Sequence, residues 1–185
     1  MDMNKIIEIL ELMKSSTIDN YVLAGLSSSL IGQEGFGKVR LFEKDLHQRD
    51  SMTPHSHRFN FVCLVLAGYV TNHVWEETTE CDVGADKFLQ SKLTYSGTIG
   101  SHTKDKDQIN YYSSSSYEYC PGEVYSMFHD QIHSITFSKG AKVLFFEGPN
   151  ISDQSVIIEP MIGSQTIPTY EVADWMFKPR KQDIV

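Results

Sequence analysis

The chain has only three cysteines, Cys63, Cys81 and Cys120, and no two of them form a C-x-x-C pair. An odd number of scattered cysteines does not make a disulfide scaffold, so we expect a reducing, cytoplasmic compartment. No apolar run approaches the roughly 18 residues that a membrane-spanning helix needs. The first residues are acidic and amphipathic rather than continuously apolar, so we also expect no signal peptide.

Positive charge is scarce as well. The 185 residues include 16 lysines and arginines against 24 aspartates and glutamates, which gives a formal net charge of −8. Nucleic acid and anionic membranes both require a basic face, so we expect neither of them to be the main partner. The length suits one domain with a hydrophobic core, and the sequence has no internal repeat.

Apolar residues near the start of the chain fall at helical spacing. Ile6, Leu10 and Met13 lie on one face of a helix expected over residues 4–14. A second helix is expected over residues 18–30. We interpret both helices as a cover that packs on the main domain or on a partner subunit.

The middle of the chain consists of short apolar or alternating segments separated by turn residues. Strands are expected over residues 38–42, 59–66, 69–75, 88–95, 111–119, 124–127, 132–137, 142–147 and 155–159. Many short strands in succession predict an all-β sandwich or small barrel. We therefore divide the chain into a helical segment (1–31), a β-barrel (32–160) and a C-terminal extension (161–185) with a short helix over 170–177.

Two histidines stand one residue apart just before the apolar strand over residues 59–66. Because residues two apart on a strand share a face, the imidazoles of His55 and His57 can converge on one point. Imidazole is a ligand suited to iron, zinc, copper and nickel. The pair fits either two metal ligands or two partly buried, hydrogen-bonded histidines.

The spacing of further residues resembles the cupin superfamily. In the first cupin motif a glycine follows the first histidine of an H-x-H pair by 13 residues, as Gly68 follows His55 here. The second motif is a turn with a histidine 11 residues after its glycine, as in Pro121-Gly122-Glu123 and His133. The resemblance covers about residues 38–148.

The resemblance implies a double-stranded β-helix, or jelly roll, in which His55, His57 and His133 bind a metal inside the barrel. Many cupins have a glutamate as a fourth ligand six residues after the first histidine, but Phe61 occupies that position here. A three-histidine site remains, similar to that of the thiol dioxygenase branch. We expect Fe(II), with zinc, nickel or manganese as alternatives. Three neutral ligands leave the charge of the ion uncompensated, which favours an anionic or chelating substrate.

Other side chains are candidates for catalysis or for contact with substrate at this site. His129 or Tyr125 is our candidate for the catalytic base. Cys63 lies six residues after His57, so strand alternation directs both side chains to the same face. Cys63 either lines the pocket or serves as a small buried hydrophobic residue. Strand alternation directs Arg58 to the face opposite the two histidines, so it is a weaker candidate for a contact with substrate.

The resemblance implies a metal-dependent cupin. We expect a non-haem Fe(II) oxygenase of the dioxygenase type that acts on a small polar molecule. One alternative is a cupin that binds a small ligand without turnover, and another is a metal-dependent isomerase or hydrolase of the same fold. Since cupins often pair through sheet edges, a homodimer is expected by analogy.

Overall fold

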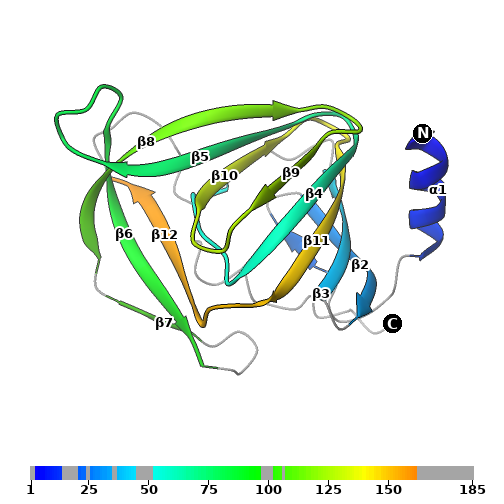
Figure 1. Cartoon of the computed structure of the whole chain (residues 1–185), viewed down its shortest axis with the longest axis horizontal. Helices are drawn as coiled ribbons and strands as arrows, with labels where there is room; N and C mark the ends of the chain where they lie inside the picture. Colours follow the sequence, from blue (N-terminus) through cyan, green and yellow to red (C-terminus); the bar gives the residue numbers. More distant parts are fainter. Residues whose placement is uncertain are drawn as a thin grey trace, which may run out of the picture.

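The computed structural model describes residues 3–13, 21–23, 26–34, 37–44, 52–96, 102–105 and 107–161. Within these ranges one helix, α1 (Met3–Met13), precedes twelve strands (Figure 1). The strands are β1 (Tyr21–Leu23), β2 (Leu26–Glu34), β3 (Gly37–Lys44), β4 (Phe59–Ala67), β5 (Val70–Thr78), β6 (Asp86–Tyr95), β7 (His102–Lys104), β8 (Gln108–Tyr119), β9 (Val124–Met127), β10 (Ile132–Phe137), β11 (Lys142–Asn150) and β12 (Gln154–Pro160).

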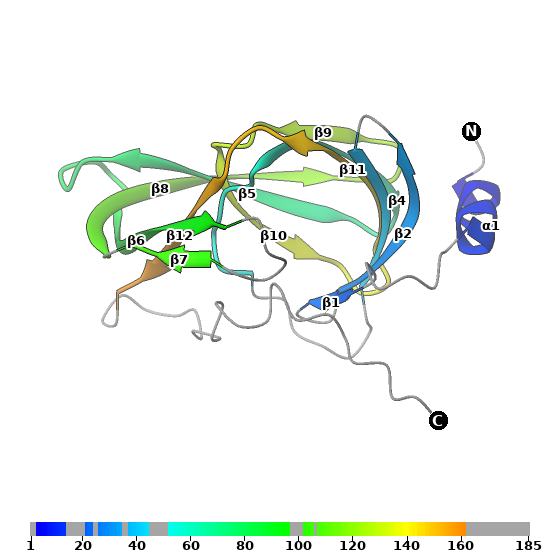
Figure 2. The ribbon, with the colours of Figure 1, turned by 90° about the horizontal axis from the view of Figure 1, so that it is seen from below.

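The strands form two antiparallel sheets. The first sheet has the order β1-β2-β3-β11-β4-β9, and the second has the order β10-β5-β8-β6-β12, with β7 paired to β6. The chain crosses between the sheets repeatedly, since β4, β9 and β11 lie in the first and β5, β8 and β10 in the second. This is the predicted double-stranded β-helix, or jelly roll. Both ribbon views show α1 outside the first sheet and the second sheet extending away from it (Figures 1 and 2).

Alternation along the strands directs one set of side chains between the sheets. On β10 every second residue is buried, namely His133, Ile135 and Phe137. Phe61 and Cys63 are buried in the same way on β4, and the apolar members of both strands belong to one core cluster. Burying a side chain of this size contributes about 1.5–3 kcal/mol to folding. The strands around His133 are therefore anchored by the main core.

The predicted second helix over residues 18–30 is wrong. Its described part forms β1 and the start of β2, and β2 pairs with β3. Leu26, Ser28 and Leu30 are all buried in alternation, which is the period of a strand. Leu23, Leu26 and Leu30 also fit a helical spacing, so the sequence pattern is ambiguous and the pairing with β3 decides the conformation.

The strands predicted between residues 38 and 159 are confirmed, with ends that shift by a few residues, and β7 is an addition to them. The predicted helix over 170–177 lies outside the described residues. The division of the chain at residues 31 and 160 stays a prediction, and β2 crosses the first of these two boundaries.

α1 agrees with the helix predicted over residues 4–14 and packs on the first sheet. Leu10 is buried against Leu41, Leu66 and Leu144, which come from β3, β4 and β11. Lys142 on β11 adds ion pairs to Glu11 of the helix and to Glu43 of β3. At 11 residues, this sole helix of the described part of the chain is too short to cross a membrane.

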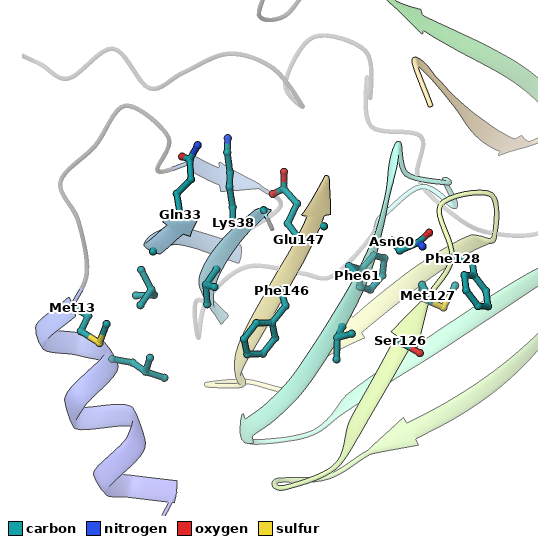
Figure 3. Close-up of a pocket in the computed structure, with 17 residues that line it drawn as sticks. Met13, Gln33, Lys38, Asn60, Phe61, Ser126, Met127, Phe128, Phe146 and Glu147 are labelled. Carbon is teal, nitrogen blue, oxygen red and sulfur yellow. The ribbon is translucent and has the colours of Figure 1, made fainter. Parts of the chain in front are cut away.

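A cavity of about 740 Å³ lies between α1 and the outer face of the first sheet (Figure 3). Leu10 and Met13 line it from the helix, and Val62 and Phe146 line it from β4 and β11. Lys38 and Glu147 are among its few charged lining residues. None of the described residues that line it is a histidine.

Candidate metal centre

The structure brings together the three histidines that the sequence singles out. One ring nitrogen each from His55, His57 and His133 lies within 4.8 Å of the others. The Nε2 atoms of His57 and His133 are 3.0 Å apart. An ion with bonds of about 2.1 Å to nitrogen holds two ligands at right angles about 3.0 Å apart, so this spacing suits two ligands of one ion.

Backbone hydrogen bonds fix the segment that carries the first two histidines, although it belongs to no regular strand. His55 N donates to His133 O and His133 N donates to His55 O, both at 2.9 Å. Ser56 N donates to Val156 O at 2.8 Å, and His57 N donates to His129 O at 3.0 Å. The segment is thereby tied to β10, to β12 and to the loop before β10, which sets the direction of both imidazoles.

The other ring nitrogens of two histidines have partners that orient them for ligation. His133 Nδ1 donates to Asn72 Oδ1 at 2.7 Å, and Asn72 Nδ2 donates to Met127 Sδ at 3.4 Å. His55 Nδ1 donates to the carbonyl oxygen of Thr53 at 2.8 Å. With Nδ1 protonated in a neutral imidazole, Nε2 keeps its lone pair, as a metal ligand requires.

Sequence reasoning missed Asn72. It is an inward-facing amide on β5, two residues from Val70 and from Val74, and it is only 2% exposed. A buried amide needs hydrogen-bond partners. The inward position of Asn72 on the strand predicted over residues 69–75 could therefore have indicated a polar contact inside the barrel. Its partner, His133, lies 61 residues further along the chain, and only the pairing of β5 with β10 brings the two together.

All three imidazoles have lowered pKa values, and burial is the main cause. The pKa of His57 is further lowered by His55 and His133, and the pKa of His133 by His55. These rings are therefore neutral at neutral pH. Metal binding to imidazole requires an uncharged ring, so the neutral rings of this cluster suit a divalent cation.

These shifts predict that the metal-free protein loses stability as the pH falls below 6.5, the ordinary histidine value. In the unfolded chain the histidines take up protons at that pH, whereas in the folded chain they do so only at lower pH. The free energy of unfolding then drops by up to about 1.4 kcal/mol per pH unit for each such histidine.

Urea denaturation of the metal-free protein at pH 7.5, 6.5 and 5.5 measures this dependence. Because other groups also titrate, the His57→Gln variant is the reference. We expect the variant to lose less stability than the native chain between pH 6.5 and 5.5. An equal loss in both proteins would contradict the assignment of a depressed pKa to His57.

Phe61 packs against the three-histidine cluster. The side chain is 2% exposed, and its ring centroid lies 4.9 Å from that of His57 and 5.4 Å from that of His133. Among the described residues, no carboxylate or thiol joins the three imidazoles. The cluster is thus a set of three neutral ligands with an aromatic wall.

The cluster opens on a cavity of about 270 Å³ inside the barrel. Its apolar wall includes Phe59, Phe145 and Ile135. Its polar lining residues other than the histidines are Arg40, Ser56, Arg58, Cys63, Tyr95, Tyr125, Glu147 and Ser155. A small, mostly apolar cavity with a few convergent polar groups is typical of a site for a small molecule.

Cys63 and Tyr125 are cross-strand neighbours on β4 and β9 that both line this cavity. Burial raises the pKa of the Cys63 thiol to about 12, so the thiol is protonated at neutral pH. Burial is also the first cause that raises the pKa of Tyr125 well above its usual value, and the neighbouring Cys63 raises it further. Tyr125 is therefore a neutral phenol, suited to donate a proton rather than to accept one.

The two candidate bases differ in position. The buried hydroxyl of Tyr125 has no hydrogen-bond partner of normal geometry in the described part of the chain, and it borders the cavity. His129 is absent from the residues that line this cavity, and it contributes its main chain instead. Its carbonyl accepts a hydrogen bond from His57 N, and its N–H donates to Asn60 Oδ1 at 2.9 Å.

The prediction that Arg58 points away from the histidines is wrong, because Arg58 lines the same cavity. Regular pairing on β4 begins only at Phe59, and the backbone bends at Arg58, so strand alternation does not extend to it. The guanidinium carbon lies 4.2 Å from the centroid of the Tyr95 ring. Tyr95 was not singled out in the sequence, since it contributes to the cavity from β6, far along the chain.

Comparison with known proteins gives a likeness at the level of solved structures only. No protein-family model matches the sequence, and no curated protein matches it significantly. The structure titled Streptomyces albus HEPD with substrate 2-hydroxyethylphosphonate and Fe(II) bound is 8% identical with a TM-score of 0.40. That match covers 69% of this chain, which spans only 22% of the HEPD chain.

Two further structures are similar at the same low level. KdgF from Halomonas sp. is 12% identical with a TM-score of 0.38, and the match covers 72% of this chain and 88% of that one. Drosophila melanogaster CENP-C bound to CAL1 is 11% identical with a TM-score of 0.40, over 78% of this chain and 94% of that one. Values this low describe a general likeness and assign no activity to this chain.

Proposed function

We propose that this protein is a metal-dependent cupin enzyme, a non-haem Fe(II) oxygenase of the dioxygenase type that acts on a small polar molecule. The observation that supports the proposal is the convergence of three neutral imidazoles beside a cavity of about 270 Å³. A site with only three protein ligands leaves positions open for water, dioxygen or substrate, whereas a structural site is closed.

In this proposal His55, His57 and His133 hold the ion, while Thr53 and Asn72 orient two of the three rings. Fe(II), when bound, would supply the exchange of electrons between the substrate and dioxygen. Phe59, Phe61 and Phe145 form an aromatic part of the cavity wall beside these three histidines. Iron is our first choice of metal, and zinc, nickel or manganese would suit the same three ligands.

Tyr125 is our first candidate for a catalytic residue, and His129 is the second. The neutral phenol of Tyr125 borders the cavity, so it can donate a proton or a hydrogen bond to a bound molecule. His129 is tied through its main chain to His57, which places it next to the cluster without placing its ring in the cavity.

Oxygen consumption tests the proposed reaction. The protein is loaded with Fe(II) in the absence of oxygen and then mixed with oxygenated buffer and a panel of small thiols and small carboxylic acids. We expect at least one compound to cause oxygen uptake that requires iron and is lost in the His133→Ala variant. The His73→Ala variant is the matched control, since His73 bonds to Ser116 and Thr136 outside the cluster.

The replacement of the usual glutamate by Phe61 favours a second candidate function, a cupin that binds a small ligand without turnover. Stoichiometric iron with no oxygen uptake from any compound would contradict the oxygenase and support this alternative. Turnover with zinc, nickel or manganese in place of iron would instead support the isomerase or hydrolase.

A homodimer also stays a prediction. β9 is the last strand of the first sheet, and its Val124 and the following Phe128 are exposed apolar side chains. An edge strand with exposed apolar residues is a common place for two copies of a chain to meet.

A further inference from the structure

The cavity contains a cation, Arg58, that forms no ion pair with any carboxylate of the described residues. The guanidinium carbon of Arg58 lies over the Tyr95 ring, 4.2 Å from its centroid, and the Tyr95 hydroxyl is 3.0 Å from Ser155 Oγ. Arg58, Tyr95 and Ser155 all line the cavity that holds the three histidines. In the part of the chain that the structure describes, no carboxylate forms an ion pair with Arg58.

The other arginine that lines the cavity, Arg40, is neutralised by an ion pair. Arg40 is 5% exposed, and its Nε donates to Glu147 Oε2 at 3.2 Å while its NH1 group donates to Ser28 Oγ at 3.4 Å. Among the described residues, Glu147 is the one acidic residue that lines the cavity, and it forms an ion pair with Arg40. The chain carries an excess of acidic residues, yet none of those described is placed to neutralise Arg58.

The contact with Tyr95 does not occupy the N–H donors of the Arg58 guanidinium. A cation–π contact holds the guanidinium through its charge. The N–H donors remain available in the fork that matches the two oxygens of a carboxylate. The Tyr95 ring and its contact with Ser155 hold this platform in place, so Arg58 is oriented before any ligand arrives.

We propose that Arg58 binds the carboxylate of a small organic acid, with Tyr95 as the residue that positions the guanidinium. The substrate then has two attachment points, one at Arg58 and the other at the three-histidine cluster. The assignment of the second point rests on the proposed function, whereas the first depends only on the contacts of Arg58.

Binding to the metal-free protein tests the proposal separately from the metal chemistry. The protein is treated with EDTA, and the binding of propanoate, its neutral isostere propanamide, and methylphosphonate is measured by NMR titration, following the Arg58 Nε–H resonance. We expect propanoate to shift this resonance and to bind at least about tenfold more tightly than propanamide, as a charge-assisted hydrogen bond implies.

Variants of both residues make the test specific. Arg58→Gln is expected to weaken propanoate binding at least about tenfold, and Arg58→Lys to give an intermediate loss because the charge remains without the fork. Lys139→Gln removes the same charge from an exposed turn outside the cavity and is expected to change nothing. Tyr95→Phe keeps the ring and should retain binding, whereas Tyr95→Leu removes the platform and should weaken it.

Three results would overturn the proposal. The first is absence of propanoate binding in a protein that unfolds like the native chain, and the second is equal binding by the native chain and Arg58→Gln. The third is a preference for propanamide or methylphosphonate over propanoate. Failure of metal binding or of oxygen uptake would contradict the proposed function and leave this measurement unaffected, because it is made without metal.

Discussion

Replacing His133 by alanine is expected to remove stoichiometric metal binding and to weaken the affinity for Fe(II) by at least about 100-fold. His133 is 4% exposed, and its Nε2 atom faces that of His57 at 3.0 Å. Loss of one of three ligands leaves two imidazoles and no neighbouring carboxylate to replace it among the described residues. His55→Ala should have the same effect for the same reason.

Elemental analysis after anaerobic loading and gel filtration measures the expected loss. The native chain and the His73→Ala control should each retain one metal ion per chain, because His73 contacts Ser116 and Thr136 rather than the cluster. Circular dichroism shows whether each variant is folded. Full metal content in folded His133→Ala and His55→Ala variants would contradict the three-histidine site.

The Asn72→Leu variant tests whether the orientation of His133 matters for metal binding. It keeps all three ligands but removes the acceptor that holds the proton of His133 on Nδ1. Loss of such an orienting partner weakens metal binding about 10- to 100-fold. We therefore expect an affinity between those of the native chain and His133→Ala, measured by competition with a chelator.

Replacing Gly68 by alanine is expected to destabilise the fold by at least about 3 kcal/mol, more than most single substitutions do. Gly68 has φ of +68°, and an added Cβ would lie 2.4 Å from Ser138 Oγ and 2.9 Å from Ala141 Cα. Ser138 cannot move away easily, because its Oγ accepts a hydrogen bond from Tyr69 N at 2.8 Å. The substitution therefore combines backbone strain with a collision against the turn before β11.

Gly84 provides the matched control for this substitution. It also has a positive φ, +81°, but an added Cβ would meet no atom within 4 Å. Gly84→Ala should therefore cost only the left-handed backbone strain, about 1–2 kcal/mol. Urea denaturation at one pH gives both values, and an equal loss in the two variants would contradict the collision at Gly68.

The local sequence predicts much of the barrel because strand signals are short-range. The alternation of buried residues along 132–137 coincides with β10, and Gly68 supplies the left-handed conformation of the turn between β4 and β5. The helix predicted over residues 18–30 is wrong because the leucines there fit both a helical and a strand period. Only hydrogen bonding to β3 selects the strand.

Turn residues and strand periods in the sequence predict an all-β sandwich or small barrel. The spacing of two motifs that resemble those of cupins adds the jelly roll and singles out His55, His57 and His133. The orientation of these rings and the residues that surround them depend on long-range strand pairing. The contacts of Asn72 with His133 and of Arg58 with Tyr95 join residues 61 and 37 positions apart in the printed sequence. Such contacts depend on strand pairing and on the bend before β4, which no local pattern records.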